Sequence, residues 1–173
     1  MRRLTTTALL ACAVHGLAAC ANNPEHGYTL APAYRTDIQT IAVPIFDMAD
    51  FAPGLELELT EAVVKEIHRT TPWKVVARGQ ADTILTGVIT DASLRKLSTD
   101  RDTGLVQEMA YALTASFEWK DRTTGRVLVS RRNFRAAEPY VPARPAQERV
   151  DTGQRGAIEE LARAIVAELR SSW

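Results

Sequence analysis

The stretch QEMAYALTASFEW, residues 107–119, has the most regular pattern in the chain and decides how the rest is interpreted. From residue 109 onward, every second position is apolar: Met109, Tyr111, Leu113, Ala115, Phe117 and Trp119. The positions between them are small or polar: Glu108, Ala110, Ala112, Thr114, Ser116 and Glu118. Because successive side chains of a strand point to opposite faces of a sheet, this alternation predicts a β-strand with one buried face.

Downstream, the chain turns and is predicted to form another strand and a helix. Residues 121–125 are rich in turn formers, and residues 127–134 follow at hairpin distance, which predicts an antiparallel partner for the central strand. Residues 136–149 contain three prolines and no helical period, so they are interpreted as a semi-rigid surface connector. A helix is predicted to start at Asp151 or Thr152, because apolar residues then recur at helical spacing: Ile158, Leu161, Ala162, Ile165 and Leu169.

Upstream of the central strand, residues 73–76 and 83–94 are rich in Val, Ile, Leu and Thr. Gly79 and Asp82 lie between these runs, so the two are interpreted as one broken or bulged strand. A polar connection over residues 95–104 joins it to the central strand.

A further strand and helix precede these segments. Residues 38–45 are predicted to form a strand in which Pro44 marks an edge or the strand's end. A helix follows and ends before Pro72, with an apolar residue at every fourth position: Leu55, Leu59, Val63 and Ile67. The order strand, helix, three strands, helix predicts an α/β (α+β) fold. We expect a two-layer sandwich in which two helices pack on one face of a four-stranded mixed sheet, with strands one and two parallel and the second face open to a partner.

The first twenty residues have the features of a bacterial lipoprotein signal. Two arginines precede an apolar run over residues 4–17 that is too short for a permanent membrane span. The run ends in Leu17, Ala18, Ala19 and Cys20, and this order of a branched apolar residue, two small residues and cysteine is what lipoprotein processing recognises. We therefore predict cleavage before Cys20, which then bears a diacylglyceryl and an N-acyl group.

This prediction divides the chain into three parts. Residues 1–19 are a signal peptide that is removed, residues 20–35 are a tether, and residues 36–173 form a single domain. Each acyl methylene buried in a membrane contributes about 0.8 kcal/mol, so several chains make a stable anchor. The residue after the cysteine is Ala21 rather than an aspartate that would signal retention at the inner membrane. The expected location is therefore the periplasmic face of the outer membrane.

Composition and motifs argue against an enzyme. The chain has 21 basic and 21 acidic residues, and removal of a signal with two arginines leaves a net charge of −2, which gives no nucleic-acid signal. Outside the signal, only His26 and His68 are available as bases, and no G-x-S-x-G elbow, glycine-rich phosphate loop or Cys/His cluster occurs. We expect no catalysis, no metal and no cofactor beyond the acyl groups on Cys20.

Basic residues occur in two places that are of interest for binding. Arg95, Lys96 and Arg101 lie in or beside the predicted connection between the second and third strands, and Arg144 lies in the proline-containing connector. Guanidinium and ammonium groups pair well with phosphate or carboxylate groups of an anionic lipid. The alternative is ordinary solvated charge, because acidic residues are interleaved with these cations.

Several short phrases, in this order and spacing, resemble the LPS-assembly lipoprotein family (LptE), and the resemblance covers nearly the whole mature chain. The phrases are the lipobox that ends at Cys20, GY at 27–28, TIAVPIF at 40–46, GLE at 54–56, ADTILTG at 81–87, QE at 107–108 and FEWKD at 117–121.

The resemblance implies a non-enzymatic outer-membrane lipoprotein that sits as a plug inside a large β-barrel translocon, assists its assembly and helps deliver lipopolysaccharide to the cell surface. It also implies lipopolysaccharide as a ligand of Arg101 and Arg144, with Arg95 and Lys96 as further candidates. An alternative is a periplasmic scaffold or secretion-accessory lipoprotein that binds protein or peptidoglycan. This alternative stays open because IAVPIF followed by an amphipathic helix also resembles Tol-associated and curli-secretion-like proteins.

Overall fold

The computed structural model describes residues 34–49, 54–142 and 149–171, all of which belong to one compact unit, Ala33–Trp173. The predicted signal peptide, Cys20, the tether up to residue 33 and Arg144 lie outside the described residues. The elements follow the order β1 (Thr40–Ala42), β2 (Asp47–Met48), α2 (Leu55–Thr70), β3 (Lys74–Val75), β4 (Thr83–Thr99), β5 (Val106–Asp121), β6 (Val127–Tyr140) and α3 (Val150–Ser171).

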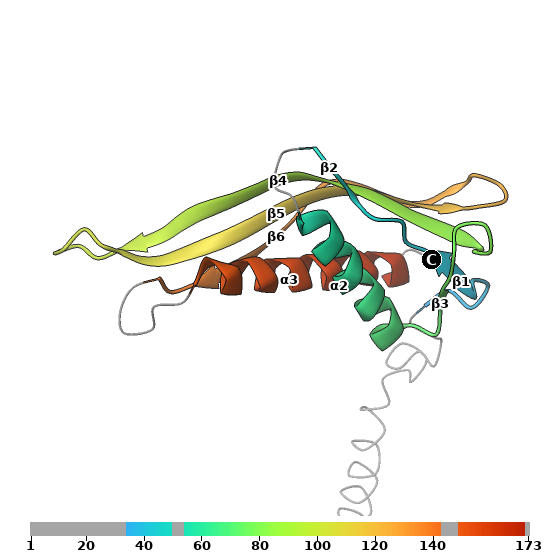
Figure 1. Cartoon of the computed structure of the whole chain (residues 1–173), viewed down its shortest axis with the longest axis horizontal. Helices are drawn as coiled ribbons and strands as arrows, with labels where there is room; N and C mark the ends of the chain where they lie inside the picture. Colours follow the sequence, from blue (N-terminus) through green and yellow to red (C-terminus); the bar gives the residue numbers. More distant parts are fainter. Residues whose placement is uncertain (1–33, 50–53, 143–148, 172–173) are drawn as a thin grey trace, which may run out of the picture. The chain divides into compact units, whose positions relative to one another are not determined.

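Two layers are visible: a mixed sheet, and the helices α2 and α3, which both lie on one face of it (Figure 1). The expected α+β class and the one-sided helix layer are confirmed. The sheet runs in the order β3-β1-β4-β5-β6, with β2 also paired to β4. The number of strands is therefore a correction, because the described residues form six strands rather than four.

The two extra strands have clear local causes. The predicted strand over residues 38–45 is shortened to β1, which ends before Pro44, a residue with no N–H to donate, and β2 follows outside the predicted range at Asp47–Met48. The predicted broken strand separates completely, because β3 and β4 pair in parallel with opposite edges of β1. Asp82 fixes the second of these pairings, since its carboxylate accepts the main-chain N–H groups of Gln39 and Thr40 at 3.1 and 2.9 Å.

The β4, β5 and β6 strands form a long antiparallel ladder, and its outer strands are longer than expected. The predicted strand over residues 107–119 is confirmed as β5. Strand β4 continues to Thr99, so Arg95 and Lys96 belong to a strand rather than to a connection. Strand β6 continues to Tyr140, so the interpretation of residues 136–149 as connector is wrong for its first part. Proline is tolerated there because β6 is an edge strand.

The core lies between the sheet and the helices. Helix α3 packs on β6 and β5, and α2 packs on α3. The apolar stripes of both helices are buried in one cluster with residues of the sheet, which includes Leu59, Val63, Ile67, Leu85, Ile89, Leu113, Trp119, Leu161, Ile165 and Leu169. Helix α3 approaches β6 closely at Gly153, where an added Cβ would come within 2.6 Å of the Tyr140 ring. This contact places the first turn of α3 beside the end of β6.

A glycine in β4 tests how tightly this core is packed. An added Cβ at Gly87 would clash with the ring of Phe46, which is 1% exposed and has little room to move. We predict that Gly87→Ala lowers the free energy of unfolding by about 1–3 kcal/mol, the usual cost of overpacking a core. Gly79→Ala is the matched control, because nothing lies within 4 Å of its added Cβ. Chemical denaturation showing equal effects for the two variants would contradict this packing.

Candidate functional site

The β4–β5 hairpin extends beyond the helix layer because strands and helices differ in rise per residue. Strand β4 has 17 residues, which span about 55 Å at about 3.3 Å per residue. Helix α3 has 22 residues but spans only about 33 Å at about 1.5 Å per residue. Its first turn packs on Tyr140, which pairs through Met109 with Lys96. The hairpin past Lys96 therefore runs beyond the start of α3, as Figure 1 shows.

Three predicted binding residues lie on this hairpin, Arg95 and Lys96 at the level where α3 begins and Arg101 beyond it. Lys96 pairs with Met109 and Arg95 with Ala110, so the two cations point to opposite faces of the sheet. Arg101 lies in the turn between the two strands. All three side chains are exposed, and none forms a hydrogen bond or ion pair with another residue in the described ranges. The structure thus places these three predicted residues on one hairpin, each available to a ligand.

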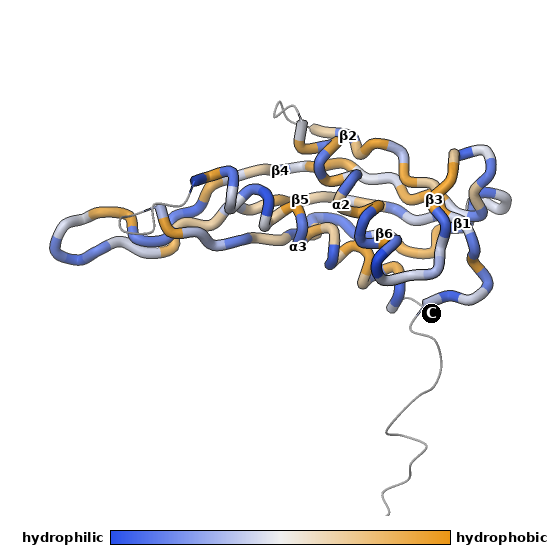
Figure 2. The backbone as a smooth tube through the Cα atoms, turned by 60° about the horizontal axis from the view of Figure 1, so that its bottom comes forward, coloured by the Kyte–Doolittle hydropathy of each residue, from blue (hydrophilic) through white to orange (hydrophobic). Residues whose placement is uncertain are grey.

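Exposed leucines accompany the cations, and the sequence analysis missed them. Leu94, Leu97 and Leu105 are 48, 52 and 63% exposed. Figure 2 shows hydrophobic and hydrophilic segments following one another along this hairpin. A leucine followed by a cation is an ordinary strand pattern in sequence. Leu97 and Leu105 lie past Lys96, beyond the start of α3, whereas Leu94 pairs with Tyr111 and lies level with the first turns of α3. The hairpin therefore offers both apolar and cationic contacts.

The tip of the hairpin is held by an aspartate. The Asp100 carboxylate accepts the main-chain N–H groups of Asp102 and Thr103 at 3.0 and 2.8 Å, and the Thr103 hydroxyl at 2.8 Å. The turn closes at Gly104, whose φ of 71° suits glycine. Hydrogen bonds from Thr103 hold the pKa of the Asp100 carboxyl below its ordinary value. The Asp100 charge is therefore part of the turn and is not simply an opposing charge beside Arg101.

Other cations in the described ranges are engaged elsewhere or lie away from the hairpin. Arg131 forms an ion pair with Glu168 of α3 at 2.6 Å, and Arg149 pairs with Asp151 at 3.3 Å. Arg132 and Arg135 are exposed on the edge strand β6. None of these residues adds to the cations of the hairpin tip.

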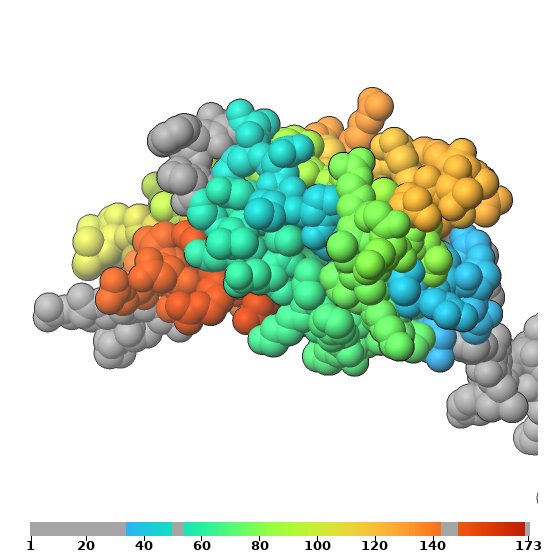
Figure 3. All heavy atoms as spheres, turned by 45° about the vertical axis from the view of Figure 1, so that its right-hand side comes forward, coloured from blue at the N-terminus to red at the C-terminus, as the bar shows by residue number. Residues whose placement is uncertain are grey.

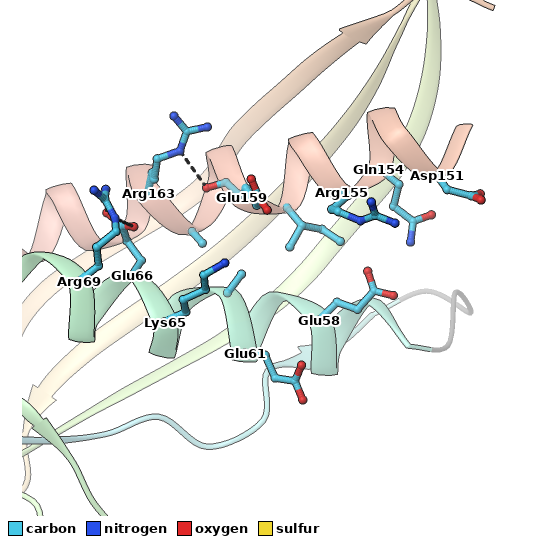
Figure 4. A pocket seen from close by; sticks show the side chains of 13 residues that line it. Glu58, Glu61, Lys65, Glu66, Arg69, Asp151, Gln154, Arg155, Glu159 and Arg163 are labelled. Atoms are coloured by element: carbon cyan, nitrogen blue, oxygen red, sulfur yellow. Dashed lines mark hydrogen bonds and ion pairs between the residues drawn. The ribbon is translucent and has the colours of Figure 1, made fainter. Parts of the chain in front are cut away.

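A cleft of about 930 Å³ lies between α2 and α3. Its floor is apolar and includes Ala62, Ile158 and Ala162, whereas its rim contains charged side chains of both signs (Figure 4). Several rim groups already have partners, including Arg69, which pairs with Glu66 at 2.8 Å. This cleft has no concentration of one charge and no nucleophile with an adjacent base, so it fits the solvated helix faces that the sequence predicts.

The described part of the chain contains neither a metal-binding cluster nor a membrane-spanning helix. Among those residues, no group of three His, Cys, Asp or Glu side chains is placed to hold a metal ion. No helix in the same ranges is long and apolar enough to cross a membrane. His68 is exposed near the end of α2 and has no hydrogen-bonded nucleophile there.

These features define a small two-layer α+β domain with an uncovered, amphipathic hairpin and no catalytic constellation in its described residues. The family model for lipopolysaccharide assembly, LptE, matches residues 38–171, and the chain belongs to this family. This match confirms the family that the sequence resembles. Members are envelope lipoproteins that associate with the lipopolysaccharide-transport machinery and are not enzymes, so the prediction of a non-enzymatic protein is confirmed as well.

Solved structures with the same fold are distant in sequence. The hypothetical protein CT253 from Chlamydia trachomatis has a TM-score of 0.57 at 9% identity, over 78% of this chain and 97% of that one. The protein XCC0632 from Xanthomonas campestris has a TM-score of 0.51 at 17% identity, over 75% of this chain and 82% of that one. A PelC dodecamer from Paraburkholderia phytofirmans has a TM-score of 0.50 at 17% identity, over 82% of this chain and 95% of that one. At these identities the likeness shows the fold alone, and the comparison with curated proteins found no match.

The Asp100 cap gives a prediction for the turn. Asp100→Ala removes the acceptor for the Thr103 amide, so we expect faster hydrogen exchange at this amide with little change in global stability, whereas Asp100→Asn keeps an acceptor and most of the protection. Because the pKa is lowered, the stabilisation is present above the ordinary aspartate pKa and is lost as the pH falls through the lowered value. An NMR titration midpoint for Asp100 at or above about 3.9 would contradict this cap.

Proposed function

We propose that this protein is an outer-membrane lipoprotein that acts as the plug and binding subunit of a β-barrel translocon. In this role it assists assembly of the barrel and delivery of lipopolysaccharide to the cell surface. The family match over residues 38–171 supports this proposal. The lipobox at Cys20 supports it independently, because a lipid anchor would confine the domain near a partner in the same membrane and raise its effective concentration there.

The open face of the sheet suits a position against the interior of a barrel. Both helices lie on the opposite face, and the strand register places small or hydroxyl side chains on the open one. Described residues of this face include Thr86, Ser93, Ala112, Thr114, Ser116, Ser130 and Ala137. The interior of an outer-membrane barrel is polar, and this face suits it because most of its side chains are small, hydroxyl or charged, with Ile84 and Val88 as the apolar members.

Lipopolysaccharide contact is assigned in this proposal to the stem of the β4–β5 hairpin. The observation on which it rests is that the side chains of Arg95 and Lys96 are unpaired within the described residues, and that Lys96 shares a face of the sheet with the exposed Leu94. Lipopolysaccharide combines phosphate groups with acyl chains, and a cation beside an exposed leucine matches both parts. Arg144, the other sequence candidate, lies outside the described residues, and Arg101 lies at the tip, away from this stem.

Charge reversal tests the stem. We predict that Arg95→Glu with Lys96→Glu weakens binding of purified lipopolysaccharide at least about tenfold, because each lost charge-assisted hydrogen bond is worth about 1.5–3 kcal/mol. The matched control is Lys74→Glu with Arg78→Glu. It reverses two exposed cations whose side chains have no partner in the described residues. The outcome against the proposal is an equal loss for both double variants, since that would show a general charge effect.

Cys20→Ser tests the anchor and the partner together. We predict that this variant is released from washed membranes in cells without the barrel, because no acyl groups can be attached. In wild-type cells, the lipidated protein should co-purify with an outer-membrane barrel after detergent extraction. Recovery with peptidoglycan or a secretion pore, and without a barrel, would instead favour the alternative of a scaffold or secretion-accessory lipoprotein.

A further inference from the structure

The segment that leads from the predicted tether into the sheet, residues 34–42, has only short pairings with its neighbours. It contains β1, whose register covers two residue pairs with β3 and two with β4. Its side chains Ile38 and Ile41 are buried. Because β1 is the first described strand after Cys20, a pull on the lipid would enter the sheet through this segment.

Asp82 adds a second set of contacts to this segment. Its carboxylate Oδ2 accepts the main-chain N–H groups of Gln39 and Thr40 at 3.1 and 2.9 Å. In return, the main-chain N–H of Asp82 donates to the Thr40 hydroxyl oxygen at 2.8 Å. An ionised carboxylate makes stronger hydrogen bonds than a neutral acceptor. The loop before β4 thus holds the start of β1 by three hydrogen bonds beyond the strand pairing.

The loop that contains Asp82 is itself held by Arg122, which lies in the turn between β5 and β6. The Arg122 guanidinium donates through Nε to the carbonyl of Ala81, and its main-chain N–H donates to the carbonyl of Asp82 at 2.9 Å. Figure 3 shows this end of the molecule, where the segment around β1, the loop before β4 and the β5–β6 turn lie beside one another. The contacts therefore form a series that leads from the long ladder through Arg122 and Asp82 to β1.

The other turn of the ladder shows that the Arg122 contacts are not needed to form the turn. The first turn reads DRDTGL from Asp100, and the second reads DRTTGR from Asp121. In each, the aspartate Oδ1 accepts two main-chain N–H groups and a threonine hydroxyl, and the glycine has a φ of 71°. Arg101 has the position of Arg122, but its guanidinium has no partner within the described residues. The bonds of Arg122 thus serve the neighbouring loop rather than the turn.

We propose that Asp82 and Arg122 form a two-step latch that holds the anchor-bearing segment in the sheet. Asp82 binds the segment directly, and Arg122 is a positioning residue that acts through the Ala81–Asp82 loop. While the latch is closed, a pull on the lipid passes into the long ladder. When it opens, residues 34–42 leave the sheet and lengthen the tether by up to about 30 Å. The response to a pull rests on the lipid anchor of the proposed function, whereas the coupling of Arg122 to β1 does not.

Hydrogen exchange measured by NMR on the lipidated chain in detergent micelles tests the coupling. Asp82→Ala should speed exchange at the Gln39 and Thr40 amides at least about tenfold, because both lose a charge-assisted acceptor. Arg122→Gln should speed exchange at the same two amides at least about threefold, although Arg122 binds neither of them. The amide of Leu113, which is buried in the core, reports global unfolding and should stay within about twofold of wild type in both variants.

Two further variants separate a latch from independent contacts. Arg101→Gln is the matched control, because it removes the arginine from the same position of the equivalent turn, and it should leave exchange at Gln39 and Thr40 unchanged. For contacts in series, the double variant of Asp82→Ala and Arg122→Gln should exchange no more than about twofold faster than Asp82→Ala alone. Effects that multiply in the double variant, or wild-type exchange at both amides in Arg122→Gln, would overturn the latch.

Force measurements test the response to a pull. In the mature chain, residues 20–173, prepared without acyl groups, Cys20 is the only cysteine, so one handle can be attached at the natural anchor point and another at the last residue. Asp82→Ala and Arg122→Gln should both lower the force of the first extension, whereas Arg101→Gln should not. Equal forces for all of these proteins and wild type would overturn the mechanical role. Mass spectrometry that finds no acyl groups on Cys20 in cells would overturn the anchor of the proposed function together with that role, and would leave the exchange result as the test of the coupling.

Discussion

The uncovered hairpin of this molecule follows from the difference between the rise of a strand and that of a helix. A strand advances about 3.3 Å per residue and a helix about 1.5 Å, so the 22 residues of α3 cover only part of a ladder built from strands of 17 and 16 residues. Tyr140 and Gly153 fix where the cover begins, because their contact places the start of α3 beside the end of β6. Everything in β4 and β5 beyond that level is held only by strand pairing and by its turn.

An uncovered hairpin needs local support, and the Asp100 turn provides it. The carboxylate binds three donors from the following residues, so the tip keeps one conformation without a hydrophobic core beneath it. The same arrangement at Asp121 is further fastened to the Ala81–Asp82 loop by Arg122. One turn is therefore bound within the chain, while the other presents equivalent donors to solvent.

Much of the architecture could be predicted from side-chain periodicity. The alternation in residues 107–119 identifies β5, and the apolar stripes identify α2 and α3, because burial on one face imposes these periods directly. The separation of β3 from β4 could not be predicted, since it depends on both runs pairing with β1 through contacts 40 or so residues apart in the chain, such as Asp82 with Thr40. The extension of β6 through Pro139 was missed because proline favours a connector locally, whereas an edge strand tolerates it.

The candidate site was predicted in part for similar reasons. The cations Arg95, Lys96 and Arg101 stand out by residue type, and the structure places them on one hairpin. The exposure of Leu97 and Leu105 could not be recognised, because it depends on where α3 begins. The repeated D-R-x-T-G pattern was available in the sequence, but its meaning depends on seeing Arg122 bound and Arg101 unbound within the described residues.

Site-specific photo-crosslinking in intact cells tests most directly whether the uncovered hairpin is the working end of the molecule. A photoreactive residue at Leu97, which is 52% exposed on the hairpin stem, should form adducts with lipopolysaccharide, whereas the same residue at the exposed Gln80 should form none. Lipopolysaccharide adducts of equal yield at both positions, or at Gln80 alone, would contradict the account.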